Sequence, residues 1–453
     1  MVSCGAVVVA APASGSGKTT IATGLMAALR QAGHCVAPFK VGPDFIDPGY
    51  HALAAARPGR NLDSVLVGEE LIGPLFRHGC DGADIAVIEG VMGLFDGRID
   101  EWFSLPARGS TGEVARLLGA PVLLVIDARG QSQSAAAVLQ GFAAASADVH
   151  VGGVILNRVG SARHEQVLRQ ACESVGVPVL GAVPRNDALS VPSRHLGLVT
   201  AVEHGADAQA AVAAMADLVT RHVDVAAVAA MARSAVNAAP WSPSDQIGAD
   251  PAGRTPVVAV AAGRAFSFGY AERDELLRAA GAEVVMFDPL TDLLPEGTGA
   301  LVLPGGFPEE HAAELSANSA LRSQIGTLAA TAPVHAECGG LTYLMDDLDG
   351  TPMCGVLAGS ARFTERLTIG YRDAVAAIDS PLFGAGERVT GHEFHRTTVD
   401  FGEQVQPAWL LEGRGTDPVA DGAVRHGLHA AYLHTHPAAR PHAVRRFVGL
   451  ATL

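Results

Sequence analysis

The sequence has little of what a secreted, membrane-spanning or metal-cluster protein needs. Its six cysteines are widely spaced and form no CxxC pair, which argues against a disulfide framework and against a zinc or iron–sulfur site. Its apolar runs stop short of the ~18–20 residues that cross a bilayer, and its N-terminal segment lacks the basic start of a signal peptide. We therefore expect a protein of the reducing cytoplasm without a membrane partner.

Basic residues are also scarce relative to acidic ones. The chain has 32 Lys and Arg residues against 47 Asp and Glu residues, and its formal net charge is −15. Because a nucleic acid is bound through basic patches, we expect no nucleic-acid partner, although a few local donors can hold a small anion. Apolar residues, in contrast, make up 49% of the 453 residues, which is enough for more than one core.

Short apolar runs alternate with helical patterns in the first half of the chain. Helices are expected at residues 18–31 and from the capping box Ser110–Glu113 to about residue 119. Strands are expected at residues 5–10, 34–40, 84–90, 121–127 and 151–157. Val/Ile/Leu-rich strands separated by helices predict a parallel sheet covered on both faces.

Composition divides the chain into two α/β domains. Residues 236–253 are rich in Pro, Ser, Asp and Gly and are predicted to be a linker between domains at 1–235 and 254–453. The tail beyond residue 355 is richer in strand-like segments. Further strands of the second domain are expected at residues 256–263, 282–289, 300–306 and 333–340.

A glycine-rich segment follows the first expected strand and opens the first helix. Its glycines would let backbone N–H groups surround phosphate oxygens, while Lys18 reaches the β- and γ-phosphates and the Thr19 hydroxyl binds Mg²⁺. Pro12 stands where the first glycine of GxxxxGK[ST] would be, and a simple glycine-rich turn is the alternative. The residues expected to bind ATP are Ser14, Gly15, Ser16, Gly17, Lys18, Thr19, Thr20 and Lys40.

Charged side chains follow two of the other expected strands. Lys40, Asp44 and Asp47 come after the second strand, whereas Glu89 and Asp96 follow the third. In open α/β sheets ligands bind at the carboxyl ends of strands, and carboxylates beside a triphosphate are natural Mg²⁺ ligands. The alternative is that Asp44 and Asp47 only cap turns.

Cys338 lies where an apolar strand runs into a helix. Such a tight turn holds a cysteine at the sheet edge, and the helix N-terminus is expected to lower the thiol pKa and favour the nucleophilic thiolate. Gly339 and Gly340 would permit the strained turn. Backbone N–H groups of Gly305, Gly306 and Gly339 could form an oxyanion hole. A buried small residue is the alternative interpretation of this cysteine.

Two groups of histidines lie in the C-terminal part of the chain. His434 and His436 in YLHTHP are candidate general bases for the thiol, and a structural role for either is the alternative. His392, Glu393 and His395 in GHEFHR are expected on a strand, where HxxH lacks the i, i+4 helical geometry of a catalytic zinc site. Their role stays open.

Taken in order, these segments resemble the cobyrinic and hydrogenobyrinic acid a,c-diamide synthases of cobalamin biosynthesis over essentially the full length. The actinobacterial members, which use metal-free hydrogenobyrinate, are most similar. The segments that carry the resemblance are APASGSGKTT, VGPDFIDPGYH, VIEGVMGLFDG, ILNRVG, LPGGFPE, HAECGG, GHEFHR and YLHTHP.

The resemblance implies a dethiobiotin-synthetase-like P-loop domain followed by a class I glutamine amidotransferase domain of the triad type. It makes Cys338 the glutaminase nucleophile and His434 its partner. In the wider amidotransferase pattern a glutamate follows the histidine by two residues, but His436 stands there in this chain, so the third member of the triad stays open. Ala336 replaces the first glycine of the usual GxCxG turn.

The resemblance also implies a carbon–nitrogen ligase that uses ATP, Mg²⁺ and L-glutamine. Such an enzyme converts the a and c carboxylates of hydrogenobyrinate or cobyrinate to amides, through an acyl phosphate and ammonia released from glutamine. Thr19, Asp44 and Glu89 are then expected to hold Mg²⁺. Asp44, Asp47 and Asp96 are expected near the ATP and the carboxylate that is activated.

Two other functions agree with the same residues. One is a cobyric acid synthase-like enzyme that amidates other corrin carboxylates. The other is a P-loop ATPase switch with an inactive glutaminase domain. The sequence leaves open whether the corrin carries cobalt, which residues hold the macrocycle, and the oligomeric state, with a homodimer among the options.

Overall fold

A computed structural model of the chain describes residues 4–99, 103–185, 193–194, 197–248, 255–412 and 417–451. The chain forms two compact units, Met1–Trp241 (unit 1) and Ser242–Leu453 (unit 2). This boundary falls inside the segment 236–253, for which the composition predicts a linker. Trp241 is buried in unit 1, where its backbone N–H donates to the Pro74 carbonyl at 2.9 Å.

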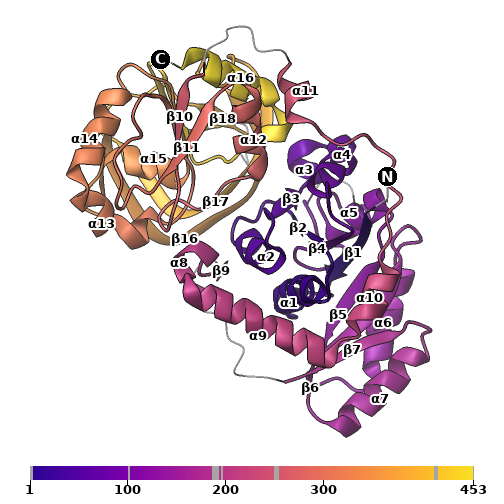
Figure 1. The fold of residues 1–453 in the computed structure, drawn as a ribbon. Coiled ribbons are helices and arrows are strands. Elements are labelled where there is room, and N and C mark those ends of the chain that lie inside the picture. The colour runs from indigo at the N-terminus through magenta and orange to yellow at the C-terminus, as the bar shows by residue number, and fades with distance from the viewer. Residues whose placement is uncertain are drawn as a thin grey trace. The chain divides into compact units, whose positions relative to one another are not determined.

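Unit 1 is built on one seven-stranded sheet in which every neighbouring pair of strands is parallel (Figure 1). The strands are almost completely buried, as their runs of Val, Ile and Leu predict. The parallel α/β fold predicted for this half is confirmed. In sheet order the strands are β3 (Arg60–Leu62), β2 (Val36–Val41), β4 (Ile85–Glu89), β1 (Gly5–Ala10), β5 (Val122–Asp127), β6 (Val151–Val159) and β7 (Val179–Pro184).

Helices cover this sheet, and their ends follow from local chemistry. The helix α1 begins after Gly17, whose φ of 97° suits glycine, and α5 begins where the Ser110 hydroxyl accepts the Glu113 N–H. Figure 1 shows α9 running beside α1. The main helices of unit 1 are α1 (Lys18–Gln31), α2 (Asp47–Ala55), α4 (Glu69–Gly79), α5 (Thr111–Leu118), α6 (Ser134–Ala144), α7 (Ala162–Glu173), α9 (Ala206–His222) and α10 (Val225–Met231). The short helices are α3 (Ser64–Val67) and α8 (Ala201–His204). The short strands β8 (Ser193–Arg194) and β9 (Gly197–Leu198) pair antiparallel with each other.

Unit 2 has a six-stranded sheet that is parallel except at one edge, where β20 and β21 are antiparallel. The strand that precedes Cys338 lies in the middle of this sheet, next to the strand that precedes His434. In sheet order the strands are β11 (Glu283–Phe287), β10 (Val257–Ala261), β12 (Thr298–Leu303), β13 (Val334–Glu337), β21 (Leu428–Ala431) and β20 (Ala423–Arg425).

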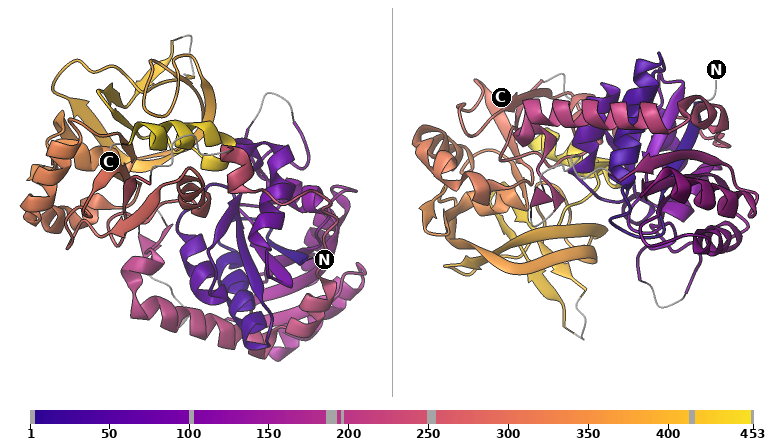
Figure 2. Two further views of the ribbon diagram at one scale, coloured as in Figure 1. Left: turned by 45° about the horizontal axis from the view of Figure 1, so that its top comes forward. Right: turned by 90° about the horizontal axis from the view of Figure 1, so that it is seen from below.

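A second sheet in unit 2 accounts for the β-rich tail that the sequence predicts. Its longest strands, β16 and β17, pair antiparallel and form the extended ribbon seen in Figure 2. The strands are β15 (Thr351–Pro352), β14 (Met345–Leu348), β16 (Leu357–Ala376), β17 (Arg388–Phe401), β18 (Trp409–Leu411) and β19 (Val419–Asp421).

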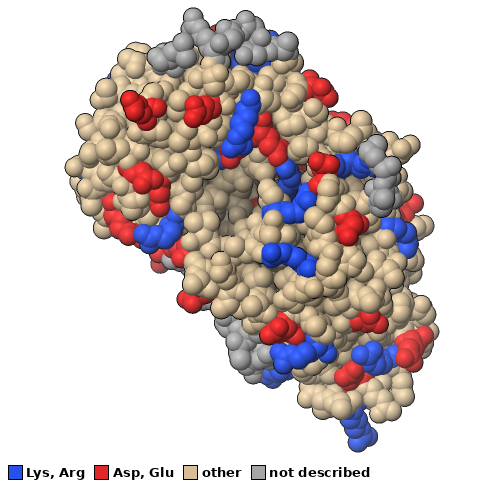
Figure 3. Space-filling view, viewed as in Figure 1, with Lys and Arg blue, Asp and Glu red and all other residues tan. Residues whose placement is uncertain are grey.

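The helices of unit 2 enclose a core of buried apolar side chains that includes Cys338. They are α11 (Pro243–Ile247), α12 (Ala271–Ala279), α13 (Ala312–Ala317), α14 (Ser319–Leu328), α15 (Gly339–Leu344) and α16 (Pro441–Leu450), with short 3₁₀ turns at η1 (Pro308–His311) and η2 (Pro437–Ala439). Among the described residues of both units, none of the helices has the length and hydropathy of a membrane span. On the face drawn in Figure 3, basic and acidic side chains are interspersed among wide areas of other residues.

Candidate active sites

The glycine-rich segment of unit 1 forms a loop between β1 and α1. Ser14 and Gly15 are exposed, whereas the buried Ser16 donates its hydroxyl to the Ala13 carbonyl at 2.9 Å. Gly15 has a φ of 75°, a conformation that costs glycine little. Lys18, Thr19 and Thr20 form the first turn of α1, so the loop and the helix N-terminus have the arrangement that binds phosphate in P-loop proteins.

Two side chains from β6, which the sequence analysis did not assign, hold this loop. Asn157 donates to the Ser16 carbonyl at 2.9 Å, and Arg158 donates to the Gly15 carbonyl at 2.8 Å. Because N–H and C=O point in opposite directions across a peptide plane, these contacts turn the N–H groups of Ser16 and Gly17 to the other side of the loop. The motif ILNRVG at the end of an apolar strand was the signal for these two residues.

Lys18 is buried and lies across the loop. Its ammonium group donates to the carbonyls of Met92 at 2.5 Å and Ala13 at 3.3 Å. Burial lowers the pKa of Lys18, and the nearby charge of Lys40 lowers it further. An anionic ligand beside this amine would favour its charged form.

Lys40 is the centre of a buried charge cluster at the carboxyl ends of β2 and β4. Its ammonium group lies 3.1 Å from the Asp47 carboxylate and 3.3 Å from that of Glu89. The Thr19 hydroxyl donates to Glu89 at 2.5 Å and lies 3.5 Å from Asp47. The structure therefore brings four of the predicted residues together, from three segments of the chain.

The two carboxylates of this cluster, Asp47 and Glu89, differ in pKa. Burial and the charges of Asp44 and Glu89 raise the pKa of Asp47 to about 7. Burial also opposes ionisation of Glu89, but the charge of Lys40 and a hydrogen bond from His51 outweigh it and lower its pKa to about 2. The fully buried His51 lies 2.7 Å from Glu89 and was not assigned from the sequence. It could have been noticed because it lies in the motif VGPDFIDPGYH.

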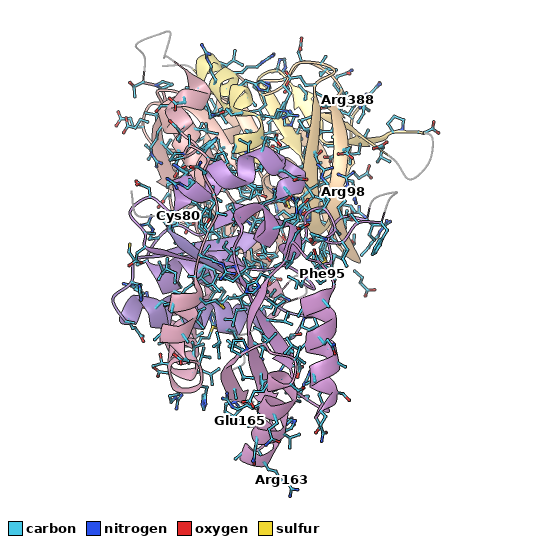
Figure 4. The ribbon with its side chains drawn as sticks, turned by 90° about the vertical axis from the view of Figure 1, so that its right-hand side faces the viewer. Cys80, Phe95, Arg98, Arg163, Glu165 and Arg388 are labelled. Atoms are coloured by element: carbon cyan, nitrogen blue, oxygen red, sulfur yellow. The ribbon has the colours of Figure 1, made fainter. Side chains whose placement is uncertain are left out.

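Asp44 and Asp96 lie near the cluster but make local contacts. One carboxylate oxygen of Asp44 accepts the N–H groups of Ile46 at 2.7 Å and Asp47 at 2.9 Å, which is the turn-capping role that the sequence allowed as an alternative. Asp96 accepts the Gly93 N–H at 3.0 Å and is exposed. Beside it, Phe95 stacks on Phe142 with ring centroids 5.7 Å apart, in the region labelled in Figure 4.

In unit 2, Cys338 occupies a strained turn between β13 and α15. Its φ of 50° and ψ of −106° are unusual for a residue with a side chain, and its N–H donates to the Ala431 carbonyl at 2.8 Å. Gly340 is required beside it, because an added Cβ there would lie 2.0 Å from the Leu303 carbonyl oxygen. The predicted strand-to-helix position of Cys338 is therefore present.

The expected lowering of the Cys338 pKa is wrong for this structure. Cys338 is only 4% exposed, and burial together with the charge of Glu309 raises the thiol pKa, which outweighs the N–H of Gly339. The helix that starts at Gly339 has six residues, so its dipole is small. The sulfur faces the Phe394 carbonyl of β17 at 3.8 Å.

The three glycines predicted to form an oxyanion hole lie close to one another. An added Cβ on Gly339 would lie 3.1 Å from the Gly306 nitrogen, and one on Gly305 would lie 2.6 Å from the Cε1 atom of His434. The segment Gly305–Gly306 thus lies close both to the turn at Cys338 and to the His434 imidazole. Backbone N–H groups at this place are suited to a developing oxyanion.

His434 follows β21, the parallel neighbour of β13, and is completely buried. Its backbone exchanges hydrogen bonds of 2.9 Å with His392 of β17 in both directions. The Nδ1 atom lies 3.4 Å from a carboxylate oxygen of Glu337, the residue directly before Cys338. Glu337 was not assigned from the sequence.

His436 and the GHEFHR residues have other contacts. The His436 ring packs on Tyr270 with centroids 4.2 Å apart, and its Nδ1 accepts the Ala438 N–H at 3.3 Å. Glu393 pairs with Arg372 at 2.6 Å, and His395 lies flat on Tyr432, with ring centroids 3.8 Å apart. The open question about GHEFHR is thus answered in part, because β17 covers the candidate thiol and packs along His434.

Family models match both units. The CobQ/CobB/MinD/ParA nucleotide binding domain matches residues 7–199, and the CobB/CobQ-like glutamine amidotransferase domain matches residues 257–442. Unit 1 is accordingly a nucleotide-binding domain, and unit 2 is a glutamine amidotransferase domain.

Proteins of known name resemble the chain along its whole length. A hydrogenobyrinate a,c-diamide synthase of Mycobacterium tuberculosis is 68% identical over 98% of both chains. One of Streptomyces coelicolor is 54% identical over 97% of this chain and 96% of its own. A cobyrinate a,c-diamide synthase of Gloeobacter violaceus is 42% identical over 98% of this chain and 96% of its own. The chain belongs to the a,c-diamide synthase family of glutamine-dependent carbon–nitrogen ligases.

Proposed function

We propose that the protein amidates the a and c carboxylates of hydrogenobyrinate, using ATP and glutamine. The two relatives at 54% and 68% identity are named for hydrogenobyrinate, whereas the one at 42% is named for cobyrinate. The observation that carries the proposal is the presence of two separate candidate centres in one chain, a phosphate loop with Lys18 and a buried thiol with His434.

In unit 2, Cys338 would attack the side-chain amide of glutamine. His434 takes the thiol proton, the new C–S bond forms, and the oxyanion is held by N–H groups of Gly306 and Gly339. Collapse of this intermediate breaks the C–N bond, and His434 gives its proton to the departing nitrogen. Ammonia leaves, and water then releases glutamate from the γ-glutamyl thioester.

Because the pKa of Cys338 is raised, the proposed glutamine hydrolysis depends on the His434 imidazole as proton acceptor. A neutral thiol is a weak nucleophile, so transfer of its proton to His434 must accompany the attack.

In unit 1, ATP would bind at Ser14–Thr20, with Lys18 and Lys40 beside its phosphates. The carboxylate of the corrin side chain attacks the γ-phosphoryl group, giving ADP and an acyl phosphate. Ammonia then displaces phosphate and forms the amide. Lysines neutralise the charge that develops on the transferred phosphoryl group.

A Mg²⁺ ion fits the donors of this site. The Thr19 hydroxyl and the Glu89 carboxylate converge within 2.5 Å of each other, and oxygen donors of this kind suit a hard cation. Both carboxylates already have partners, because one oxygen of Asp44 accepts two backbone N–H groups and the two oxygens of Glu89 contact Lys40 and His51. The ion would share or replace these contacts. When bound, the ion supplies positive charge against the phosphate oxygens.

Mass spectrometry of the products tests the assignment. The full-length protein would be given ATP with hydrogenobyrinate or cobyrinate, and with glutamine or ammonia as the nitrogen source. We expect two successive amidations of hydrogenobyrinate with either nitrogen source. Failure of both corrinoids to react with ammonia and ATP would contradict the proposed function, and faster reaction of cobyrinate would contradict the substrate.

A further inference from the structure

The carboxylate of Glu337 lies beside the imidazole of His434. Glu337 is the last residue of β13, and Cys338 follows it directly. One carboxylate oxygen lies 3.4 Å from Nδ1 of His434, while the Cε1 side of the same ring lies against Gly305. The imidazole therefore contacts the carboxylate through Nδ1, and its Cε1 and Nε2 atoms lie beside Gly305.

The other oxygen of Glu337 is fixed by separate donors. It lies 3.3 Å from the Thr435 N–H, 3.5 Å from the Thr435 hydroxyl and 3.4 Å from Nε2 of His335. The side chain is 17% exposed. Burial works against its charge, but hydrogen bonds from His335 and His434 outweigh burial and hold the pKa of Glu337 well below its usual value. The carboxylate is therefore ionised at neutral pH and is held in one orientation.

Other candidates for this place contact different groups. His436 stands where related amidotransferases have a glutamate, but its Nδ1 accepts the Ala438 N–H and its ring packs on Tyr270. Asp421 accepts the N–H groups of Tyr432 at 3.2 Å and Leu433 at 3.1 Å, one per oxygen. Glu337, in contrast, has a carboxylate oxygen 3.4 Å from the His434 ring.

We propose that Glu337 is the positioning residue for His434, in place of the usual glutamate two residues after the histidine. The carboxylate accepts the Nδ1 proton, which leaves Nε2 as the basic nitrogen that takes the thiol proton. It also stabilises the imidazolium that forms during attack. This inference rests on the proposed roles of Cys338 and His434 and adds the third member of that site.

Glu337→Gln tests the role most sharply. The Thr435 N–H and His335 retain the amide oxygen, so the amide NH₂ group faces Nδ1 of His434 and imposes the wrong tautomer. We expect kcat for glutamine hydrolysis to fall on the order of 10²–10⁴-fold with little change in KM for glutamine, while ammonia-dependent amidation and the melting temperature stay at the parent values.

Two further variants separate positioning from a structural role. Glu337→Asp keeps a carboxylate and should recover a large part of the lost kcat. His436→Asn keeps an acceptor for the Ala438 N–H and should retain glutaminase activity. The proposal is overturned if Glu337→Gln keeps parental kcat, or if Glu337→Asp or His436→Asn loses as much kcat as Glu337→Gln.

Cys338→Ala, measured beside these variants, separates this inference from the proposed function. Loss of glutaminase activity in Cys338→Ala with full activity in Glu337→Gln would overturn only the positioning role. Retained glutaminase activity in Cys338→Ala would contradict the proposed nucleophile itself.

Discussion

Unit 1 gathers charged side chains at the ends of its strands, whereas unit 2 buries its candidate thiol in an apolar core. The Lys40 ammonium lies 3.1 Å from Asp47 and 3.3 Å from Glu89, so charge is already present where a phosphoryl group would develop it. Cys338 is instead kept protonated by burial. The comparison teaches that the proposed phosphoryl-transfer site already carries charge, whereas the proposed thiol site must generate its charge by proton transfer during the reaction.

The largest change in amidation rate is expected from a substitution that disables unit 2 alone. Cys338→Ala should lower glutamine-dependent amidation on the order of 10⁶-fold, because no other group can form the thioester. Ammonia-dependent amidation should remain, since unit 1 is unchanged. Initial rates with each nitrogen source check this expectation. Cys35→Ala, at an exposed cysteine of unit 1, is the matched control and should keep both rates.

The next largest change in amidation rate is expected from a substitution that disables unit 1. Lys18→Met should lower amidation at least about 10²–10³-fold with glutamine and with ammonia alike, because the charge beside the phosphates is lost. Glutamine hydrolysis should be less affected than amidation. Arg30→Met, at an exposed position of α1, is the control. If Lys18→Met kept ammonia-dependent amidation, the assignment of amidation to unit 1 and of glutamine hydrolysis to unit 2 would be contradicted.

A smaller loss of glutaminase activity is expected when the position of the His434 imidazole in unit 2 is disturbed. In Gly305→Ala the added Cβ would lie 2.6 Å from Cε1 of His434, so the imidazole or the turn must move. We expect glutaminase activity to fall on the order of 10²-fold, as for other misplacements of about 1 Å, with ammonia-dependent activity retained. Gly326→Ala, whose Cβ would meet no atom closer than 3.9 Å, should behave as the parent protein.

The smallest effect is a difference in acid stability. Burial lowers the pKa of His429 from 6.5 to about 3, so the folded state binds fewer protons than the unfolded state between these values. The free energy of unfolding is therefore unaffected by this group above pH 6.5. Below pH 6.5 it falls by up to about 1.4 kcal/mol per pH unit, because protonation of His429 favours the unfolded state. Asp47 of unit 1 has a raised pKa and works in the opposite sense below pH 7.

Hydrogen exchange of amides in β13 and β21, compared with those in β2 and β4, measures this difference. Protection in unit 2 should decline first as the pH is lowered from 6.5, and His429→Gln should reduce that decline. Equal decline in both units, or an unchanged slope in His429→Gln, would contradict the comparison.

The places of the candidate residues in the fold were predicted well from the sequence. The segment before Lys18, the turn at Cys338 and the candidate base after an apolar strand depend on nearby residues, so patterns along the chain were enough to find them. The parallel sheet of unit 1 also followed from the strand and helix pattern. These features are determined by short-range chemistry and by hydrophobic periodicity.

Features that depend on distant pairing could not be predicted. The contact of His51 with Glu89 joins α2 to β4, and the orientation of Glu337 depends on how β13 pairs with β21. Burial of Cys338 depends on β17, whose Phe394 carbonyl faces the sulfur although 56 residues separate them in the chain. The expected low thiol pKa failed for this reason, because a local motif does not reveal what covers it.

The burial of Cys338 has a consequence for its chemical durability. Peroxides and alkylating agents attack the thiolate, and they must first reach the sulfur. A thiol that is 4% exposed and protonated at neutral pH meets neither condition. We therefore expect the Cys338 thiol to react slowly with peroxides and alkylating agents as long as glutamine is not bound.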